Sequence, residues 1–81
     1  MKKTVRVRYF ALLREQRGLD EEEVSTGAAT TAELYGELRL RHGFSLSASR
    51  VRVAINDAFE PWDSAVREGD AIAFLPPVAG G

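Results

Sequence analysis

The sequence contains no cysteine, and histidine occurs only once among its 81 residues. Without cysteine the chain forms no disulfide bond, offers no thiolate to a metal ion and has no thiol nucleophile. The formal net charge is −1, so the protein as a whole has no strong electric field that would attract nucleic acid or a membrane surface. These absences exclude several common kinds of functional site before any motif is considered.

Long hydrophobic runs are absent as well. No segment of the sequence approaches the roughly 18 consecutive apolar residues of a membrane-spanning helix. Lys2 and Lys3 stand near the start, but no long apolar stretch follows them, so this segment does not resemble a signal peptide. We therefore expect a cytoplasmic protein that binds neither membranes nor nucleic acid.

The length of the chain limits what the protein can enclose. A chain of 81 residues is enough for one domain. A domain of this size buries only roughly 60% of the surface that its unfolded chain exposes. The core is therefore thin, and little volume remains for an enclosed active site.

Alternation of apolar and polar residues predicts the main strands. In residues 4–10 two valines and a tyrosine alternate with Arg6 and Arg8, the period of a half-buried strand. Residues 50–56 and 71–75 show the same alternation, with valine, isoleucine or phenylalanine on the inner side. We expect these three segments to form the centre of a sheet.

Shorter elements are predicted between and beside these strands. Residues 11–18 form a short helical turn that a glycine ends, and residues 21–26 return as a strand that pairs with the first one. The charged run Glu21–Glu23 is typical of a solvated sheet edge. Asn56–Asp57 is a turn signal after the strand at residues 50–56. Residues 58–62 then form only a short or edge strand, because Pro61 has no amide hydrogen to donate to a neighbour.

The main helix is predicted over residues 30–43. Thr30 and Glu33 have the spacing of a capping box, and Gly43 is placed to end the helix in a left-handed conformation. One face of this helix carries Leu34, Tyr35, Leu38 and His42, whereas Leu40 points away from it. Gly36 lies in mid-helix, where glycine costs about 1 kcal/mol relative to alanine. Either a close backbone contact requires this glycine or the helix tolerates it.

Together these elements predict an α+β fold, with a mixed sheet of four or five strands and one main helix packed on one face. Residues 1–75 form the domain, and residues 76–81 form a separate extended tail. We expect the sheet face opposite the helix to be basic and apolar, which suits a protein partner better than nucleic acid. The members of this face are Arg6, Arg8, Phe10, Arg52, Ala54, Ala71, Ala73 and Leu75.

Catalytic and metal-binding patterns do not occur in the body of the chain. His42 falls in the last turn of the predicted helix, where an imidazole caps free carbonyls and the helix dipole favours a positive charge. A structural role is therefore favoured over a catalytic one. The acidic residues between Asp57 and Asp70 have the spacing of turn residues and do not form a calcium-binding loop. We expect no bound metal, no bound cofactor and no enzyme activity of the chain on its own.

The last eight residues, FLPPVAGG, form an unusual segment. Pro76 and Pro77 have a restricted backbone and no amide hydrogen, so neither a helix nor a strand continues through them. The six residues that begin with this pair reach on the order of 20 Å when extended. Gly80 and Gly81 have no side chains, which suits entry into a narrow channel, and they present an ionised terminal carboxylate.

Such a carboxylate can carry a chemical group. It can attack the α-phosphate of ATP to give an acyl adenylate, from which a thiol, an amine or a sulfide displaces AMP. Every catalytic residue would then belong to a partner. The simpler alternative is a frayed terminus, where small residues are tolerated. The two prolines and the absence of another site favour the carrier.

Three motifs connect the sequence with a known family. VRYFALLRE near the start, VAIN in the middle and EGDAIAFLPPVAGG at the end resemble the small subunit of molybdopterin synthase. Members of this family are sulfur carriers with the ubiquitin-like β-grasp fold. The resemblance extends from Val5 to Gly81, and its strongest motif is the final strand followed by PPVAGG.

The resemblance implies a sulfur carrier in molybdenum cofactor biosynthesis. Gly81 is then adenylated by a ubiquitin-activating-type adenylyltransferase that consumes ATP, and its carboxylate becomes a thiocarboxylate. In a complex of two small and two large synthase subunits, the sulfur passes to cyclic pyranopterin monophosphate. Gly80 is the neighbour that fits the channel. The residues implied to bind the partner are Phe10, Phe74, Leu75, Pro76, Pro77, Val78 and Ala79, in addition to Gly80.

Three alternatives remain open at this point. A sulfur carrier of thiamine thiazole synthesis has the same fold and also ends in two glycines. A protein modifier would join its tail to lysine side chains through isopeptide bonds. A plain interaction module would have the same body and an inert tail. Neither the pattern nor the resemblance assigns a role to Arg6, Arg8 and Arg52 on the basic face.

Overall fold

The computed structural model describes residues 2–77. In chain order the elements are β1 (Lys3–Tyr9), α1 (Ala11–Arg17), β2 (Glu21–Thr26), α2 (Thr31–His42), the 3-10 helix η1 (Ala48–Arg50), β3 (Arg52–Ile55), β4 (Ala58–Glu60) and β5 (Ala71–Leu75). The strands form one five-stranded sheet in the order β2-β1-β5-β3-β4. This arrangement confirms the predicted α+β fold with a mixed sheet.

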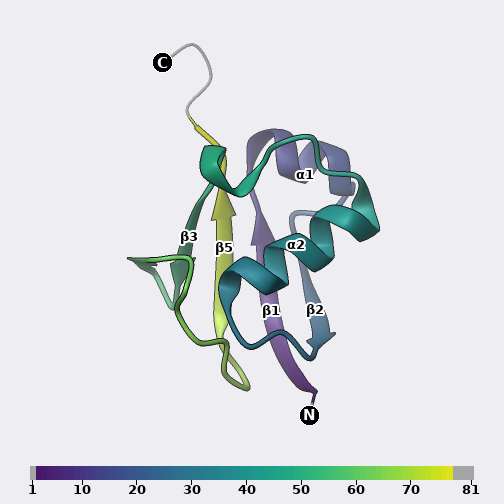
Figure 1. The fold of residues 1–81 in the computed structure, drawn as a ribbon. Helices are drawn as coiled ribbons and strands as arrows, with labels where there is room; N and C mark the ends of the chain where they lie inside the picture. The colour runs from purple at the N-terminus through teal and green to yellow at the C-terminus, as the bar shows by residue number, and fades with distance from the viewer. Residues whose placement is uncertain (1, 78–81) are drawn as a thin grey trace.

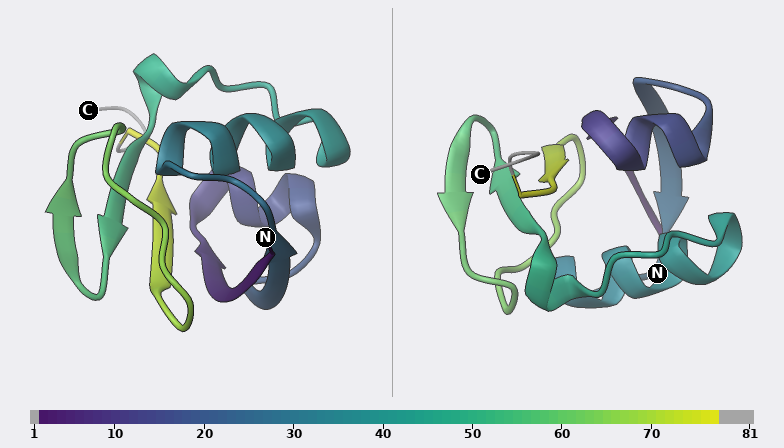
Figure 2. Two further views of the ribbon diagram at one scale, coloured as in Figure 1. Left: turned by 60° about the horizontal axis from the view of Figure 1, so that its bottom comes forward. Right: turned by 90° about the horizontal axis from the view of Figure 1, so that it is seen from above.

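The two strands nearest the ends of the chain pair with each other in the middle of the sheet. β1 and β5 run parallel, whereas β2, β3 and β4 each pair antiparallel with their neighbours. Figure 1 shows β1 and β5 pointing the same way, so that both strands finish at the same end of the sheet. The longer helix, α2, lies across one face, as both views in Figure 2 show.

The predicted alternation in β1 is confirmed. Val5, Val7 and Tyr9 are buried beneath the helix, and the two arginines between them are exposed on the opposite face. Because consecutive side chains of a strand point to opposite faces, this pattern orients the whole sheet. The buried residues of β1 join a single core whose members run from Val5 to Phe74 in the sequence.

Aromatic side chains fill the centre of this core. The ring of Tyr35 lies 5.1 Å from that of Phe74 and 5.5 Å from that of Trp62, and its hydroxyl donates to the carbonyl of Leu46 at 2.7 Å. Phe74 and Trp62 stack at 6.0 Å between ring centroids. Such pairs contribute about 0.5–1.5 kcal/mol each beyond the burial of their area. They hold α2, β5 and the chain before β5 together.

Both ends of α2 follow the sequence prediction. Thr30 accepts a hydrogen bond from the amide of Glu33 at 3.3 Å, and Gly43 adopts φ 71° with its amide donating to Arg39. The carboxylate of Glu33 reaches back to the amide of Ala29, one residue before the cap. Two further amides of the first turn donate to carbonyls of the segment between β4 and β5. The helix therefore begins with its free donors already satisfied by the chain itself.

The strand boundaries differ from the prediction by one or two residues, for example at the ends of β1 and β4, and the start of β3 is the most informative case. The strand expected at residues 50–56 begins at Arg52, and Arg50 belongs to the 3-10 helix η1 instead. β3 pairs with β5, and the last pair of that ladder is Arg52 with Leu75. Pro76 has no amide hydrogen, so the ladder has no partner for the residues before Arg52. The predicted turn at Asn56–Asp57 is confirmed, and both of its residues have the positive φ of a type I′ hairpin.

Gly36 is tolerated in α2 and is not required by packing. Apart from its chain neighbours and the backbone of its own helix, a Cβ atom at this position would have no heavy atom within 4 Å, and the residue is exposed with an ordinary helical φ. The alternative of a close backbone contact is therefore wrong for this glycine. Its cost to the helix is the entropy that glycine loses on folding.

We therefore expect Gly36→Ala to raise the free energy of unfolding by about 1 kcal/mol, since alanine favours the helix without any clash. Urea denaturation followed by circular dichroism measures this change. Gly43→Ala is the matched control, because alanine at φ 71° costs about 1–2 kcal/mol and should destabilise the protein. A Gly36→Ala protein that is less stable than the parent would contradict the assignment of open space.

Candidate functional site

The end of β5 is the place in the fold from which the tail departs. Leu75 closes the central strand, and Pro76 and Pro77 follow it without helix or strand structure. On one side Leu75 pairs with Arg52 of β3, and on the other side the parallel neighbour β1 ends and leads into Phe10. The root of the tail thus follows a central strand that lies between β1 and β3 (Figure 1).

A groove of about 520 Å³ opens beside the root of the tail. Its lining is formed by Ser49, Arg50, Val51, Arg52, Phe59, Leu75, Pro76 and Pro77. We call this set the tail-root groove. It combines apolar side chains with the guanidinium groups of Arg50 and Arg52.

Two arginines near the tail root stack on aromatic rings. The guanidinium carbon of Arg52 lies 3.9 Å from the centroid of the Phe59 ring, and that of Arg8 lies 5.3 Å from the centroid of Phe10. Arg52 and Phe59 meet because β3 and β4 form a hairpin in which Ala54 is opposite Phe59. Cation–π contacts of this kind contribute about 0.5–1 kcal/mol at exposed sites and fix the plane of the guanidinium.

The β2 side of the sheet face opposite α2 is electrically balanced. Arg6 forms ion pairs with Glu21 at 2.7 Å and with Glu23 at 3.6 Å on the neighbouring strand β2. These glutamates stand on the sheet edge, as the sequence predicted, and neutralise the arginine. Between the two ends, the face dips over three alanines of β3 and β5, namely Ala54, Ala71 and Ala73. Among the described residues, the arginines on the β3 side next to the tail root, Arg50 and Arg52, have no such ion pair.

The structure brings together part of the predicted site. Leu75, Pro76 and Pro77 line the tail-root groove, and the half-buried Phe10 lies at the same end of the sheet. Phe74 differs from its prediction as a contact residue, because its side chain is 0% exposed and belongs to the core. The alternation that turns Leu75 outward turns Phe74 inward, so the phenylalanine supports the strand from beneath.

Four of the predicted site residues lie outside the described part of the chain. These are Val78, Ala79, Gly80 and Gly81. Their assigned roles, with Gly81 as the carrier, stay predictions from the sequence.

Sequence reasoning missed Arg50, Ser49 and Phe59 as neighbours of the tail root. The exposed fraction of Phe59 is 54%, which is large for an aromatic residue. Its position opposite Ala54 was available from the predicted hairpin, since a two-residue turn at Asn56–Asp57 sets the register. Arg50 had no such signal, because its place depends on where the ladder between β3 and β5 ends.

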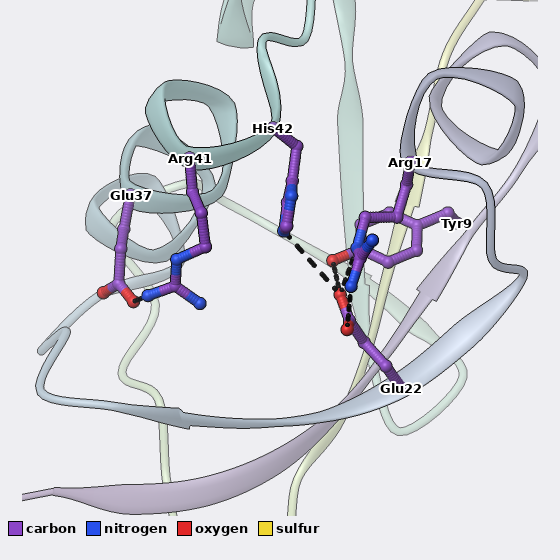
Figure 3. A network of polar contacts seen from close by, with 6 residues as sticks. All are labelled: Tyr9, Arg17, Glu22, Glu37, Arg41 and His42. Atoms are coloured by element: carbon purple, nitrogen blue, oxygen red, sulfur yellow. Dashed lines mark hydrogen bonds and ion pairs between the residues drawn. The ribbon is translucent and has the colours of Figure 1, made fainter.

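A second group of polar side chains surrounds Glu22 on the edge strand β2. Glu22 of β2 accepts hydrogen bonds from the hydroxyl of Tyr9 at 2.7 Å and from the guanidinium of Arg17 at 2.7 and 2.9 Å. The Nε2 atom of His42 lies 3.9 Å from the same carboxylate, as Figure 3 shows. Glu22 is therefore partly buried and paired, in contrast to the prediction of a solvated run.

This cluster sets the charge state of His42. Burial, followed by the positive charge of Arg17, lowers the pKa of His42 below its ordinary value, while Glu22 opposes the shift. Its Nε2 atom is buried without a hydrogen-bond partner among residues 2–77. The expected charged cap of the helix is therefore wrong, and the imidazole is a neutral group packed 5.7 Å from the ring of Phe44.

The hydrogen bonds from Arg17 hold the pKa of Glu22 below its usual range, although burial acts in the other direction. The same contact raises the pKa of Arg17, and burial together with Glu22 raises that of Tyr9. All three shifts keep the network in one protonation state near neutral pH. The network joins β1, α1, β2 and the end of α2, which is a structural role.

Within residues 2–77, the histidine and carboxylate side chains form no group of three or more that could hold a metal ion. The same part of the chain has no helix with the length and apolar character needed to span a membrane.

Comparison with protein families gives a match to the model described as the ThiS family over residues 7–81. The chain is 40% identical to the molybdopterin synthase sulfur carrier subunit of Haemophilus influenzae over 93% of its own length and 96% of that protein. It is 31% identical to the subunit of the same name from Escherichia coli, over 95% and 99% of the two chains.

Solved structures show the same fold. The molybdopterin converting factor subunit 1 of Pyrococcus furiosus superposes with a TM-score of 0.77 at 30% identity, covering 94% of this chain and 99% of that one. SAMP1 of Haloferax volcanii gives 0.78 at 26%, covering 96% and 99%. Subunit 1 in its complex with subunit 2 of the molybdopterin-converting factor of Helicobacter pylori gives 0.64 at 29%, covering 96% and 99%. These matches confirm the ubiquitin-like β-grasp fold.

The neutral His42 predicts how stability depends on pH. Since its folded pKa lies below the unfolded value of about 6.5, unfolding takes up a proton as the pH falls. The stabilisation is complete above about pH 6.5 and is lost below it, with a slope of at most about 1.4 kcal/mol per pH unit. Urea denaturation between pH 7.5 and 5.5, a range chosen to span about one unit on each side of that value, measures the slope.

His42→Gln serves as the control for this slope, because the sequence has no other histidine that titrates in the same range. We expect its stability to vary less with pH than that of the parent. An equal slope in the two proteins, or a parent that becomes more stable toward pH 5.5, would show that His42 is not buried in its neutral form.

Proposed function

This chain belongs to the ThiS family, and we propose on that basis that it is the sulfur carrier subunit of a molybdopterin synthase, with the C-terminal carboxyl group of Gly81 as the carrier. The observation that supports the proposal most directly is the position of the tail root. A central strand, held on both sides, ends in two prolines and leads directly into the last residues of the chain. A carrier needs a firm body from which its last residues depart, and the described strand pairing around Leu75 supports this part of the proposal.

The chemistry can be written for the Gly81 carboxylate. One carboxylate oxygen attacks the α-phosphate of ATP, and pyrophosphate leaves to give the acyl adenylate. A hydrosulfide ion then attacks the acyl carbon, AMP leaves, and the product is a thiocarboxylate. Transfer of that sulfur to cyclic pyranopterin monophosphate, with addition of water at the acyl carbon, restores the carboxylate. ATP is consumed by the activating partner and not held by this chain.

The partners follow from this chemistry. A larger synthase subunit receives the tail, and a ubiquitin-activating-type adenylyltransferase loads it. Support for the first partner comes from the Helicobacter pylori complex, in which a chain similar to this one is bound to subunit 2. We further propose a synthase of two small and two large subunits, with the catalytic side chains on the larger ones. Our chain contributes the sulfur and the surface that docks.

Two alternatives differ from this proposal in the partner. A carrier for thiamine thiazole synthesis is disfavoured, because both curated relatives above are molybdopterin synthase subunits. A role as a protein modifier is favoured by one observation, the likeness to SAMP1, a small archaeal modifier protein of Haloferax volcanii. Lysine-linked conjugates on a denaturing blot would support the modifier, and their absence beside active sulfur transfer would exclude it.

Removal of Gly80 and Gly81 tests the carrier role. We expect folding to change by less than about 0.5 kcal/mol, since the described core extends only from Val5 to Phe74. We expect sulfur transfer to be lost in an assay reconstituted with the larger subunit and the activating enzyme. Full transfer by the shortened protein would overturn the carrier proposal, and a loss of stability above about 1 kcal/mol would show that the tail is structural.

A Gly81→Val variant tests the need for a residue without a side chain. The branched side chain restricts the backbone and widens the tail, so we expect thiocarboxylate formation to fall sharply. Intact-mass analysis after incubation with ATP, a sulfur source and the activating enzyme measures the replacement of one oxygen by sulfur. Gly36→Ala is the control, because it changes a glycine far from the tail. Equal loading of the two variants would contradict the narrow-channel argument.

A further inference from the structure

Three arginines surround the tail root without an acidic partner. Within residues 2–77, Arg8, Arg50 and Arg52 form no ion pair, whereas Arg6, Arg17 and Arg41 each contact a glutamate. The sequence as a whole carries a net charge of −1, so this local excess does not follow from composition. Glu21 stands opposite Arg8 on β2, so the positive charge with no neighbouring glutamate on the paired strand is that of Arg50 and Arg52 in the tail-root groove.

Arg52 is held in a conformation suited to binding a carboxylate. Its guanidinium stacks on the Phe59 ring at 3.9 Å, which orients the plane while leaving the N–H groups along its edge available. A planar guanidinium binds a carboxylate through two parallel hydrogen bonds, and less entropy is lost when the plane is already fixed. Arg50 adds a second positive charge to the same groove.

Apolar surface lies next to these charges. Phe59 is 54% exposed, and Leu75, Pro76 and Pro77 continue the apolar lining to the tail root. A groove that offers both an apolar floor and an oriented cation fits a protein segment that has an acidic residue beside an apolar one. An arginine at such a position sets the register of docking as well as its strength.

We propose that the tail-root groove docks an acidic segment of the larger synthase subunit, with a carboxylate bound by Arg52 and Arg50 and an apolar side chain on Phe59 and Leu75. This inference rests on the proposed function and adds the chemistry of the partner. It gives Arg50 and Arg52 a role in selecting and orienting that subunit, so that the tail enters the channel of the subunit in the correct direction.

Nucleic acid fits this surface less well than an acidic protein segment. The aromatic rings that would stack on bases are Phe10 and Phe59, and each of them already lies against a guanidinium. Glu21 and Glu23 stand on the edge strand β2 of the same face, opposite Arg8 and Arg6, and would repel a phosphate backbone that continued across the sheet. The positive region is therefore short and bounded, as a protein contact requires.

The test is a charge reversal at the groove with binding measured against the purified larger subunit. We expect Arg52→Glu to weaken binding by about tenfold at low ionic strength, mainly through slower association, and to reduce the dependence of the affinity on salt. Arg67→Glu is the matched control, since it makes the same change in charge on the exposed turn before β5, at the opposite end of that strand. We expect its affinity to stay within about twofold of the parent.

A second variant separates charge from folding. Arg52→Met keeps an apolar stem over Phe59 but removes the charge, and we expect a smaller loss of affinity than with glutamate and an unchanged melting curve. If Arg52→Glu and Arg52→Met both bind the larger subunit as the parent does, the docking proposal is wrong. A parent protein that binds RNA oligonucleotides through Arg52, with unaltered subunit binding in Arg52→Glu, would also overturn it.

Failure of the docking proposal differs from failure of the proposed function. A parent that binds the larger subunit and transfers sulfur, together with an Arg52→Glu variant that does both equally well, removes only the role of the groove. A parent that neither binds the larger subunit nor transfers sulfur removes the proposed function, and the docking inference falls with it.

Discussion

The parallel pairing of β1 with β5 is the constraint on which the rest of the structure depends. It places the strand nearest the start of the chain beside the strand nearest its end, in register from Arg6 with Ala71 to Tyr9 with Phe74. Because both strands run the same way, Phe10 and the prolines after Leu75 follow the two strands at the same end of the sheet. The outer pairings with β2 and β3 then cover both sides of this central pair. The segment that follows β5 therefore continues from a central strand of the sheet and not from an edge strand.

The core supports this exit from below. Phe74 lies beneath the last strand and packs against Tyr35 of α2 and against Trp62. Displacing the end of β5 would open these aromatic contacts, each of which contributes on the order of 1 kcal/mol. The contacts of Phe74 therefore fix the position of the end of β5, from which the tail begins. The proposed carrier role would benefit from such support, since the proposal requires the chain end to be presented to two different partners from one defined starting point.

Charged groups are distributed unevenly over this body. At the edge formed by β2, the carboxylates of Glu21 and Glu22 are paired with Arg6 and Arg17, and the helix cap of α2 is satisfied by hydrogen bonds within the chain. Near the tail root the guanidinium groups stack on aromatic rings instead and have no described acidic partner. Internal pairing thus stabilises one side of the molecule, while the other side retains charge for an external contact. The two sides of one small sheet serve stability and recognition separately.

The sequence by itself determined the strands, the helix with its caps and the outward direction of the arginines in β1, because side-chain alternation and capping are local properties of the chain. It also identified the prolines after Leu75 as the end of the sheet, since proline lacks the amide hydrogen that pairing needs. The inward position of Phe74 was available from the same alternation, although it was first assigned to docking. Only the tertiary structure decided that Glu22 is paired, because Tyr9, Arg17 and His42 approach it from three other elements. It likewise decided that Arg50 and Arg52 share a groove with Phe59, since that depends on where the ladder between β3 and β5 stops and on the register of a hairpin, which are relations between segments and not properties of any one of them.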